Sequence, residues 1–134
     1  PETLDGQPFR QAIMRPTRLY VKPVLATLAA HPQAIRALAH ITGGGLPENL
    51  PRAYGKGLTA VVDTATFPRP PLLGAILAHV KKDECYGTFN MGIGFILIAP
   101  PGEADALIAT LKAHGEDARI IGRMEAGDTP LRLQ

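Results

Sequence analysis

The sequence contains one cysteine, Cys85, and no tryptophan among its 134 residues. A single thiol excludes both an internal disulfide framework and a zinc site built from several cysteines. It is also typical of proteins that work in a reducing compartment, so we expect a cytoplasmic protein. The histidines show no metal-ligand spacing, and we expect no metal site on this chain.

Strong charge and long apolar runs are also missing. Fourteen Lys and Arg residues oppose 12 Asp and Glu residues, and the formal net charge is only +2. Because no basic run stands out, nucleic acid is not an expected partner. The longest apolar stretch, residues 93–101, is far shorter than the roughly 20 residues of a membrane-spanning helix, so no membrane association is expected.

Proline and glycine, in contrast, are frequent, with 13 and 14 copies. They keep the apolar segments short, and the alternation of these segments predicts an α+β fold, a layered mixed sheet with helices packed on it. Residues 1–15 show no sustained periodicity and are predicted to be an arm or interdomain linker, with one domain over residues 16–134. The first residue is Pro1 rather than methionine, so we expect a piece of a longer protein.

Hydrophobic periodicity predicts the individual elements. The predicted strands cover residues 19–21, 58–62, 92–99, 118–124 and 131–133. The predicted helices cover residues 24–30, 46–55, 72–80 and 102–114. Residues 34–41 fit either a helix or a strand, and we favour a strand. Residues 81–84 are predicted to close the preceding helix with charge, and the apolar run 92–99 is predicted to be the buried central strand.

The strongest chemical signal is the glycine run at residues 43–45, between a predicted strand and a predicted helix. Such a loop lets the backbone approach a ligand closely, and its amides beside a helix N-terminus favour an anion such as phosphate. It is neither a Walker A loop nor a dinucleotide-binding motif. A plain connecting turn would also explain the glycines, but a turn does not require the polar residues around them, His40, Thr42, Glu48, Asn49 and Arg52. Replacing Gly44 with a β-branched residue is expected to lower turnover far more than stability.

Weaker signals lie elsewhere. Asn90 stands at the mouth of the predicted strand 92–99, where Gly92 and Gly94 would project to one face and are best explained by close packing. Asp63 is expected to cap the turn after its strand rather than to act in catalysis. Three polar side chains alternate along the strand predicted at residues 19–21 and its flanks, as either a basic binding face or a solvated one: Arg18, Tyr20 and Lys22.

Four segments carry a resemblance to a known family. They read Pro-Thr-Arg-Leu-Tyr-Val-Lys at 16–22, Ala-His-Ile-Thr-Gly-Gly-Gly-Leu at 39–46 with its continuation to Arg52, Phe-Asn-Met-Gly-Ile-Gly at 89–94, and Ile-Gly-Arg at 121–123. In this order they resemble the C-terminal domain of the aminoimidazole ribonucleotide synthetase (phosphoribosylformylglycinamidine cyclo-ligase) family, and the His-Ile-Thr-Gly-Gly-Gly-Leu block is the specific one. The similarity covers residues 12–134. Phe67 replaces the family's usual tryptophan, and Gly87 its usual arginine.

The resemblance implies ATP-dependent closure of formylglycinamidine ribonucleotide to aminoimidazole ribonucleotide in purine biosynthesis. It also implies a homodimeric, two-domain enzyme whose N-terminal domain, outside this sequence, holds most of the ATP and Mg²⁺, so that the isolated piece is inactive. The candidate catalytic residues are then His40 and Thr42. The candidate substrate- or phosphate-binding residues are Gly43, Gly44, Gly45, Glu48, Asn49, Arg52 and Asn90.

Two other kinds of function stay open from the sequence. Sister enzymes with the same two-domain plan share a glycine-rich turn at this place: formylglycinamidine ribonucleotide synthetase, selenophosphate synthetase and thiamine monophosphate kinase. A non-catalytic module that binds phosphate and docks on a nucleotide-binding partner is the other reading, and it predicts phosphate affinity without turnover.

Overall fold

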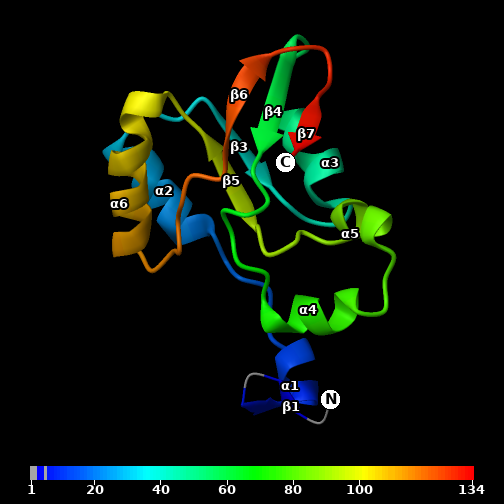
Figure 1. Ribbon diagram of the computed structural model, residues 1–134. Helices are drawn as coiled ribbons and strands as arrows, with labels where there is room; N and C mark the ends of the chain where they lie inside the picture. Colours follow the sequence, from blue (N-terminus) through cyan, green and yellow to red (C-terminus); the bar gives the residue numbers. More distant parts are fainter. Residues whose placement is uncertain (1–2, 5) are drawn as a thin grey trace.

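The computed structural model describes residues 3–4 and 6–134, and it is an α+β fold as predicted (Figure 1). The elements in chain order are β1 (Thr3–Leu4), β2 (Gln7–Pro8), α1 (Phe9–Ile13), α2 (Val21–Ala30), β3 (Ala37–His40), α3 (Gly45–Asn49), the 3-10 helix η1 (Leu50–Ala53), β4 (Leu58–Val62), α4 (Pro71–Leu77), α5 (Lys82–Thr88), β5 (Phe95–Ile98), the 3-10 helix η2 (Pro101–Glu103), α6 (Ala104–Ala113), β6 (Gly122–Ala126) and β7 (Leu131–Leu133). Within the described ranges, no helix has the length and apolarity needed to cross a membrane.

Strand β4 is the central strand of a three-stranded sheet with the order β6-β4-β7. It pairs with β6 in antiparallel and with β7 in parallel orientation, and four of its five residues, 59–62, are buried. The prediction that residues 92–99 form the central strand is therefore wrong. In the described part of the chain β5 pairs only with β3, and Ile96 is its one fully buried residue. Its other three residues are half-buried, so an apolar run of this kind does not require strands on both edges.

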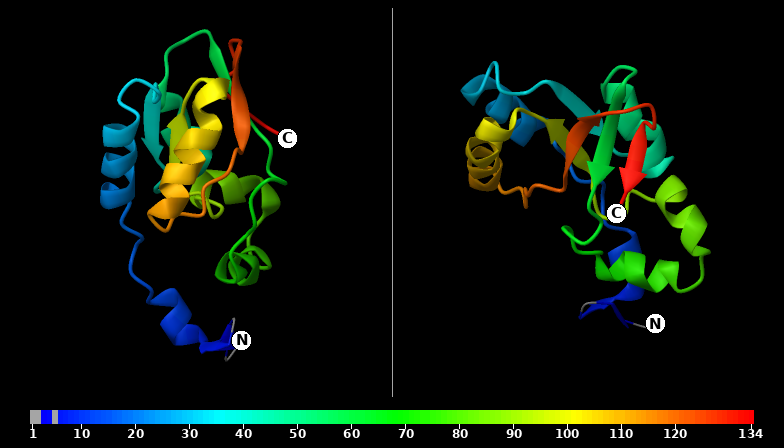
Figure 2. Two further views of the ribbon diagram at one scale, coloured as in Figure 1. Left: turned by 90° about the vertical axis from the view of Figure 1, so that its left-hand side faces the viewer. Right: turned by 45° about the horizontal axis from the view of Figure 1, so that its top comes forward.

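Helices cover the strands on two sides (Figures 1 and 2). Helices α2 and α6 pack together on one side, and α3 and α5 pack together on the other. The N-terminal β1–β2 hairpin and α1 project away from the strands, and no residue of α1 is buried. The layered arrangement of helices on mixed strands matches the predicted fold class.

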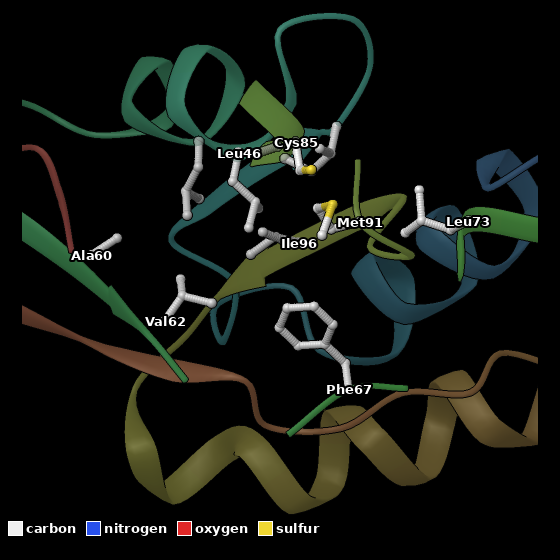
Figure 3. Close-up of a cluster of buried hydrophobic side chains, with 11 residues drawn as sticks. Leu46, Ala60, Val62, Phe67, Leu73, Cys85, Met91 and Ile96 are labelled. Atoms are coloured by element: carbon white, nitrogen blue, oxygen red, sulfur yellow. The ribbon is translucent and has the colours of Figure 1, made fainter. Parts of the chain in front are cut away.

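The core lies between the strands and the α3–α5 side (Figure 3). Leu46 from α3, Val62 from β4, Met91 and Ile96 meet there, together with the thiol of Cys85 from α5. Phe67 also lies in this core. Since each fully buried side chain of this size contributes about 1.5–3 kcal/mol, the cluster fixes α3 and the loop before it against β4 and β5.

Helix α6 follows the sequence prediction closely. Pro101 opens the preceding 3-10 turn, and acidic residues stand in the first turns, where the helix dipole favours them. At the other end Gly115 has a φ of 82°, its amide donates to the Lys112 carbonyl, and the Glu116 amide donates to the Leu111 carbonyl. This is the Schellman pattern, in which a left-handed glycine satisfies the last carbonyls of a helix.

Several predicted elements are wrong in type or position. Residues 19–21 form no strand, because Tyr20 already has helical dihedral angles and α2 begins at Val21. Residues 81–84 do not close the preceding helix, which ends at Leu77, and most of them belong to the separate helix α5. The strand predicted at 118–124 lies instead at Gly122–Ala126. Gly92 and Gly94 precede strand β5, and Gly92 occupies a turn with a φ of 95°.

Candidate functional site

The glycine loop connects β3 to α3 through a tight turn. The Gly45 amide donates to the Thr42 carbonyl over 3.0 Å, and Gly44 has a φ of 87° and a ψ of −6°. This is the third position of a type II turn, which an L side chain adopts only with strain. The turn predicted at residues 42–45 is therefore confirmed, and its glycine at 44 has a backbone reason.

Asn49 holds this loop through its side-chain amide. Its Nδ2 donates to the carbonyls of Gly45 at 2.8 Å and Gly43 at 3.0 Å, and a longer contact of 3.4 Å reaches Thr42. The carbonyls therefore face Asn49. Within residues 3–4 and 6–134, no group accepts a hydrogen bond from the amide of Gly43 or Gly44.

Loss of the Asn49 amide should loosen the loop. We expect Asn49→Ala to lower the free energy of unfolding by about 1–3 kcal/mol, because carbonyls of a half-buried turn lose their donor. Urea unfolding followed by circular dichroism measures this. The control is Arg52→Ala, which removes an exposed ion pair to Glu48 at 3.8 Å and should cost only about 0–1 kcal/mol. Equal losses in both variants would contradict the role of Asn49.

Glu48 lies against the glycine turn. An added Cβ at Gly44 would be 2.8 Å from the Glu48 Cβ and would overlap the carboxylate. A β-branched residue at Gly44 would therefore strain the turn and displace Glu48, so the expectation that it spares stability does not fit the structure. Gly43 has no positive φ and no atom within 4 Å of an added Cβ. It is the position at which a side chain tests the loop without disturbing the fold.

His40 ends β3 beside two other rings. It pairs in register with Phe95 of β5, and the two rings stack with centroids 5.7 Å apart. The Tyr20 ring meets the His40 ring edge-on at 5.8 Å and the Phe95 ring at 5.5 Å. The imidazole is exposed all the same. His40 is thus held by ring packing beside the start of the glycine loop.

Tyr20 and Arg18 do not share a strand face as predicted. The Arg18 guanidinium binds the Glu116 carboxylate at 3.0 Å and the Gly115 carbonyl at 2.8 Å, at the C-terminal end of α6. Lys22 lies exposed in α2. Burial raises the pKa of the Tyr20 hydroxyl above its usual value; Arg18 opposes this shift and Glu116 adds to it. The phenol therefore stays protonated at neutral pH.

Asn90 lies in a loop that touches the glycine loop. The Phe89 carbonyl, one residue before Asn90, would be 2.7 Å from an added Cβ on Gly45. The Asn90 side chain is exposed, and its Oδ1 accepts the Gly92 amide at 3.1 Å. Next to it the buried Met91 has a φ of 55°, a strained value for a residue with a side chain. The structure brings Asn90 near residues 43–45, while its Oδ1 is used in the hydrogen bond to the Gly92 amide within its own turn.

Asp63 forms a turn, as predicted. Its Oδ1 accepts the Ala65 amide at 2.9 Å, and its carbonyl accepts the Thr66 hydroxyl at 2.7 Å. This is an Asx turn after β4, the structural role that the sequence favoured for this carboxylate.

Tyr20 lines a hollow of about 380 Å³. Two charged residues of this hollow were not singled out from the sequence. Arg69 stands in the proline-rich loop 67–70, just before α4, and Arg119 follows α6. Arg119 is paired with Asp117, whereas the described residues place no carboxylate on Arg69. The only sequence signal was an arginine between prolines, which by itself predicts no more than an exposed loop.

Comparison with known proteins decides the family. The model of the family described as "AIR synthase related protein, C-terminal domain" matches residues 1–131. The chain belongs to this family. The resemblance read from the four sequence segments is therefore confirmed, and the mixed α+β architecture agrees with it.

Curated relatives of this chain share one name. Phosphoribosylformylglycinamidine cyclo-ligase of Albidiferax ferrireducens is 49% identical over 128 residues, which are 94% of this chain and 36% of that protein. The proteins of the same name from Polaromonas sp. and Bacillus subtilis are 48% and 40% identical, each over 91% of this chain and 35% of their own length. The chain thus spans about a third of the length of these relatives.

Proposed function

We propose that this chain is the C-terminal part of a phosphoribosylformylglycinamidine cyclo-ligase. The full-length enzyme would close formylglycinamidine ribonucleotide to aminoimidazole ribonucleotide with ATP, in purine biosynthesis. The observation that carries the proposal is the 49% identity to a relative of that name across 94% of the chain. The adjoining loops at residues 43–45 and around residue 90 support the proposal, as a place where an anionic substrate would bind.

The glycine loop is the proposed phosphate-binding element. The C=O and N–H groups of a trans peptide point in opposite directions, so the Gly44 amide points away from Asn49, which binds the Gly43 carbonyl. Together with the Gly43 amide it would supply preorganised donors that stabilise developing negative charge. Glu48 places a carboxylate beside the same loop, and its exposed pairing with Arg52 offsets that charge. In this role Asn49 orients the loop, and Gly45 packs it on α5.

His40 and Thr42 are the proposed catalytic residues. His40 is exposed next to the glycine loop, so its imidazole can exchange a proton with a substrate group held there. The Thr42 hydroxyl is exposed too, with only a long 3.4 Å contact to Asn49 Oδ1. Asn90 would contribute the Nδ2 group of its side chain from the adjoining loop, because its Oδ1 already accepts the Gly92 amide.

The rest of the enzyme completes the proposal. ATP phosphates in such reactions are usually accompanied by Mg²⁺, which takes oxygen ligands such as carboxylates. The described residues contain no group of three or more His, Cys, Asp or Glu side chains able to hold a metal ion. Because this chain spans only about a third of the length of the relatives named cyclo-ligase, we assign ATP and Mg²⁺ mainly to a preceding N-terminal domain. In this proposal residues 1–15 are the connecting arm, and the assembled form is a homodimer in the cytoplasm.

Release of ADP from ATP tests this function. The full-length protein should release ADP only when formylglycinamidine ribonucleotide is present, and the 134-residue chain alone should release none. Folded full-length protein that releases no ADP with this substrate would contradict the proposal and favour a sister enzyme of the same plan. Phosphate binding without turnover by the full-length protein would instead favour a binding module.

A further inference from the structure

Three segments far apart in the sequence meet at one side chain, that of Tyr20. Its ring lies 5.8 Å from His40, which ends β3, and 5.5 Å from Phe95, which begins β5. His40 and Phe95 stack on each other at 5.7 Å. The three rings therefore form a closed cluster in which each ring touches the other two.

Gly94 provides the space that Tyr20 occupies. An added Cβ at Gly94 would overlap the Tyr20 hydroxyl oxygen and lie 2.5 Å from Cζ of the ring. Gly94 has no positive φ, so its backbone conformation does not require glycine. The missing side chain makes room for the Tyr20 ring.

The His40 imidazole has no other restraint. Within residues 3–4 and 6–134, none of the hydrogen bonds or ion pairs involves its ring nitrogens. A side chain held at a site by neither hydrogen bonds nor burial is oriented by the groups that pack against it. Here those groups are the rings of Tyr20 and Phe95.

We propose that Tyr20, seated in the space left by Gly94, is a positioning residue that fixes the His40 imidazole at the end of β3, where the glycine loop begins. This inference rests on the proposed function of His40 and adds a residue from another segment to it. Tyr20 acts through ring packing, with its edge against the imidazole. Its hydroxyl is not needed for this role, which separates it from a proton-transferring tyrosine.

The first test measures turnover of the full-length enzyme. Gly94→Ala, which pushes the Tyr20 ring away without altering Tyr20 or His40, and Tyr20→Leu, which removes the ring, should each lower kcat about 10- to 100-fold, because small misplacement of a reacting group is costly. KM should stay unchanged. Tyr20→Phe should recover most of the rate lost in Tyr20→Leu. The matched control is Gly102→Ala, where an added Cβ meets nothing within 4 Å.

A double-mutant cycle isolates the mechanism. If Gly94→Ala acts by displacing Tyr20, it should cause little further loss of kcat in a Tyr20→Leu background. Independent, additive losses in the two variants would overturn the proposal. So would a Tyr20→Phe enzyme as slow as Tyr20→Leu, since that result would make the hydroxyl the essential group.

A spectroscopic readout separates this inference from the proposed function. In histidine-labelled full-length protein, the His40 ring protons, assigned with His40→Gln, should lose their ring-current shifts in Gly94→Ala and Tyr20→Leu. Unchanged shifts in both would overturn the positioning role. A fully active His40→Gln enzyme would defeat the proposed catalytic role of His40 instead, whatever the shifts show. An inactive His40→Gln enzyme together with wild-type rates in Gly94→Ala and Tyr20→Leu would defeat the positioning role alone.

Discussion

Gly45→Ala should lower the free energy of unfolding by about 3 kcal/mol or more, because a strained backbone and overpacking add up. Gly45 is buried and has a φ of 58°. An added Cβ would overlap the Tyr86 carbonyl oxygen and lie 2.7 Å from the Phe89 carbonyl oxygen. Both obstacles are backbone atoms of the α5 region, so no side-chain rotation relieves them. Urea unfolding followed by circular dichroism measures the loss.

Gly43→Ala is the matched control for this prediction. It introduces the same methyl group two residues earlier in the same turn, at a position with open space and no positive φ. Its free energy of unfolding should stay within about 0.5 kcal/mol of the parent value, as for ordinary surface substitutions. Comparable losses at Gly43 and Gly45 would mean that the contact with α5 does not hold the loop.

His40→Ala should lower kcat of the full-length enzyme by about 100-fold or more, the size expected when a general acid or base is removed. The effect on stability should be small, about 1 kcal/mol, because an exposed side chain loses only its two ring contacts. Steady-state ADP release together with a thermal melt distinguishes the two effects. A fall in kcat without unfolding assigns the loss to chemistry.

His79→Ala controls for the loss of a histidine in general. His79 follows α4, is exposed, and lies outside the proposed site. We expect wild-type turnover in this variant. A His40→Ala enzyme with nearly normal turnover would remove His40 from the catalytic residues and leave the glycine loop as a binding element only.

Local signals in the sequence were enough to predict the elements that are marked by nearby proline or glycine or by a β-branched, apolar run. Helix α6 has prolines before it and a left-handed glycine after it, and the turn at residues 42–45 has the glycine that its third position requires. Strand β4 was recognised from its β-branched, apolar run and lies at the predicted residues. In each case the signal that predicts the element lies within a few residues of it in the sequence.

The elements that were predicted wrongly depend on contacts with residues far away in the sequence. Leu19, Tyr20 and Val21 favour a strand by propensity, but no strand partner lies beside them and the Tyr20 ring packs on His40 and Phe95 instead. Helix α5 is short, and Cys85 anchors it in the core while it packs on α3. The secondary-structure propensity of a residue does not include contacts with such partners, and tertiary packing overrides it here.

The candidate site was predicted as a set of residues and not as an arrangement. Polar residues around a glycine run indicated one candidate loop, and the structure places Gly45 of that loop against the Phe89 carbonyl, one residue before Asn90. The sequence did not reveal that Asn49 uses its amide to hold the loop carbonyls, nor that Gly94 makes room for Tyr20. Both facts are distances between side chain and backbone, and residue types alone do not specify them.

The pairing of β4 also has a consequence for synthesis on the ribosome. Its two neighbours, β6 and β7, begin 64 and 73 residues after Leu58, at Gly122 and Leu131. Until those last segments have emerged, the apolar residues 59–62 belong to a strand with both edges open. Open apolar edges invite pairing with other chains, and such distant contacts form slowly. The nascent chain is therefore most vulnerable to aggregation, and most in need of a chaperone, in the interval before β6 and β7 have emerged.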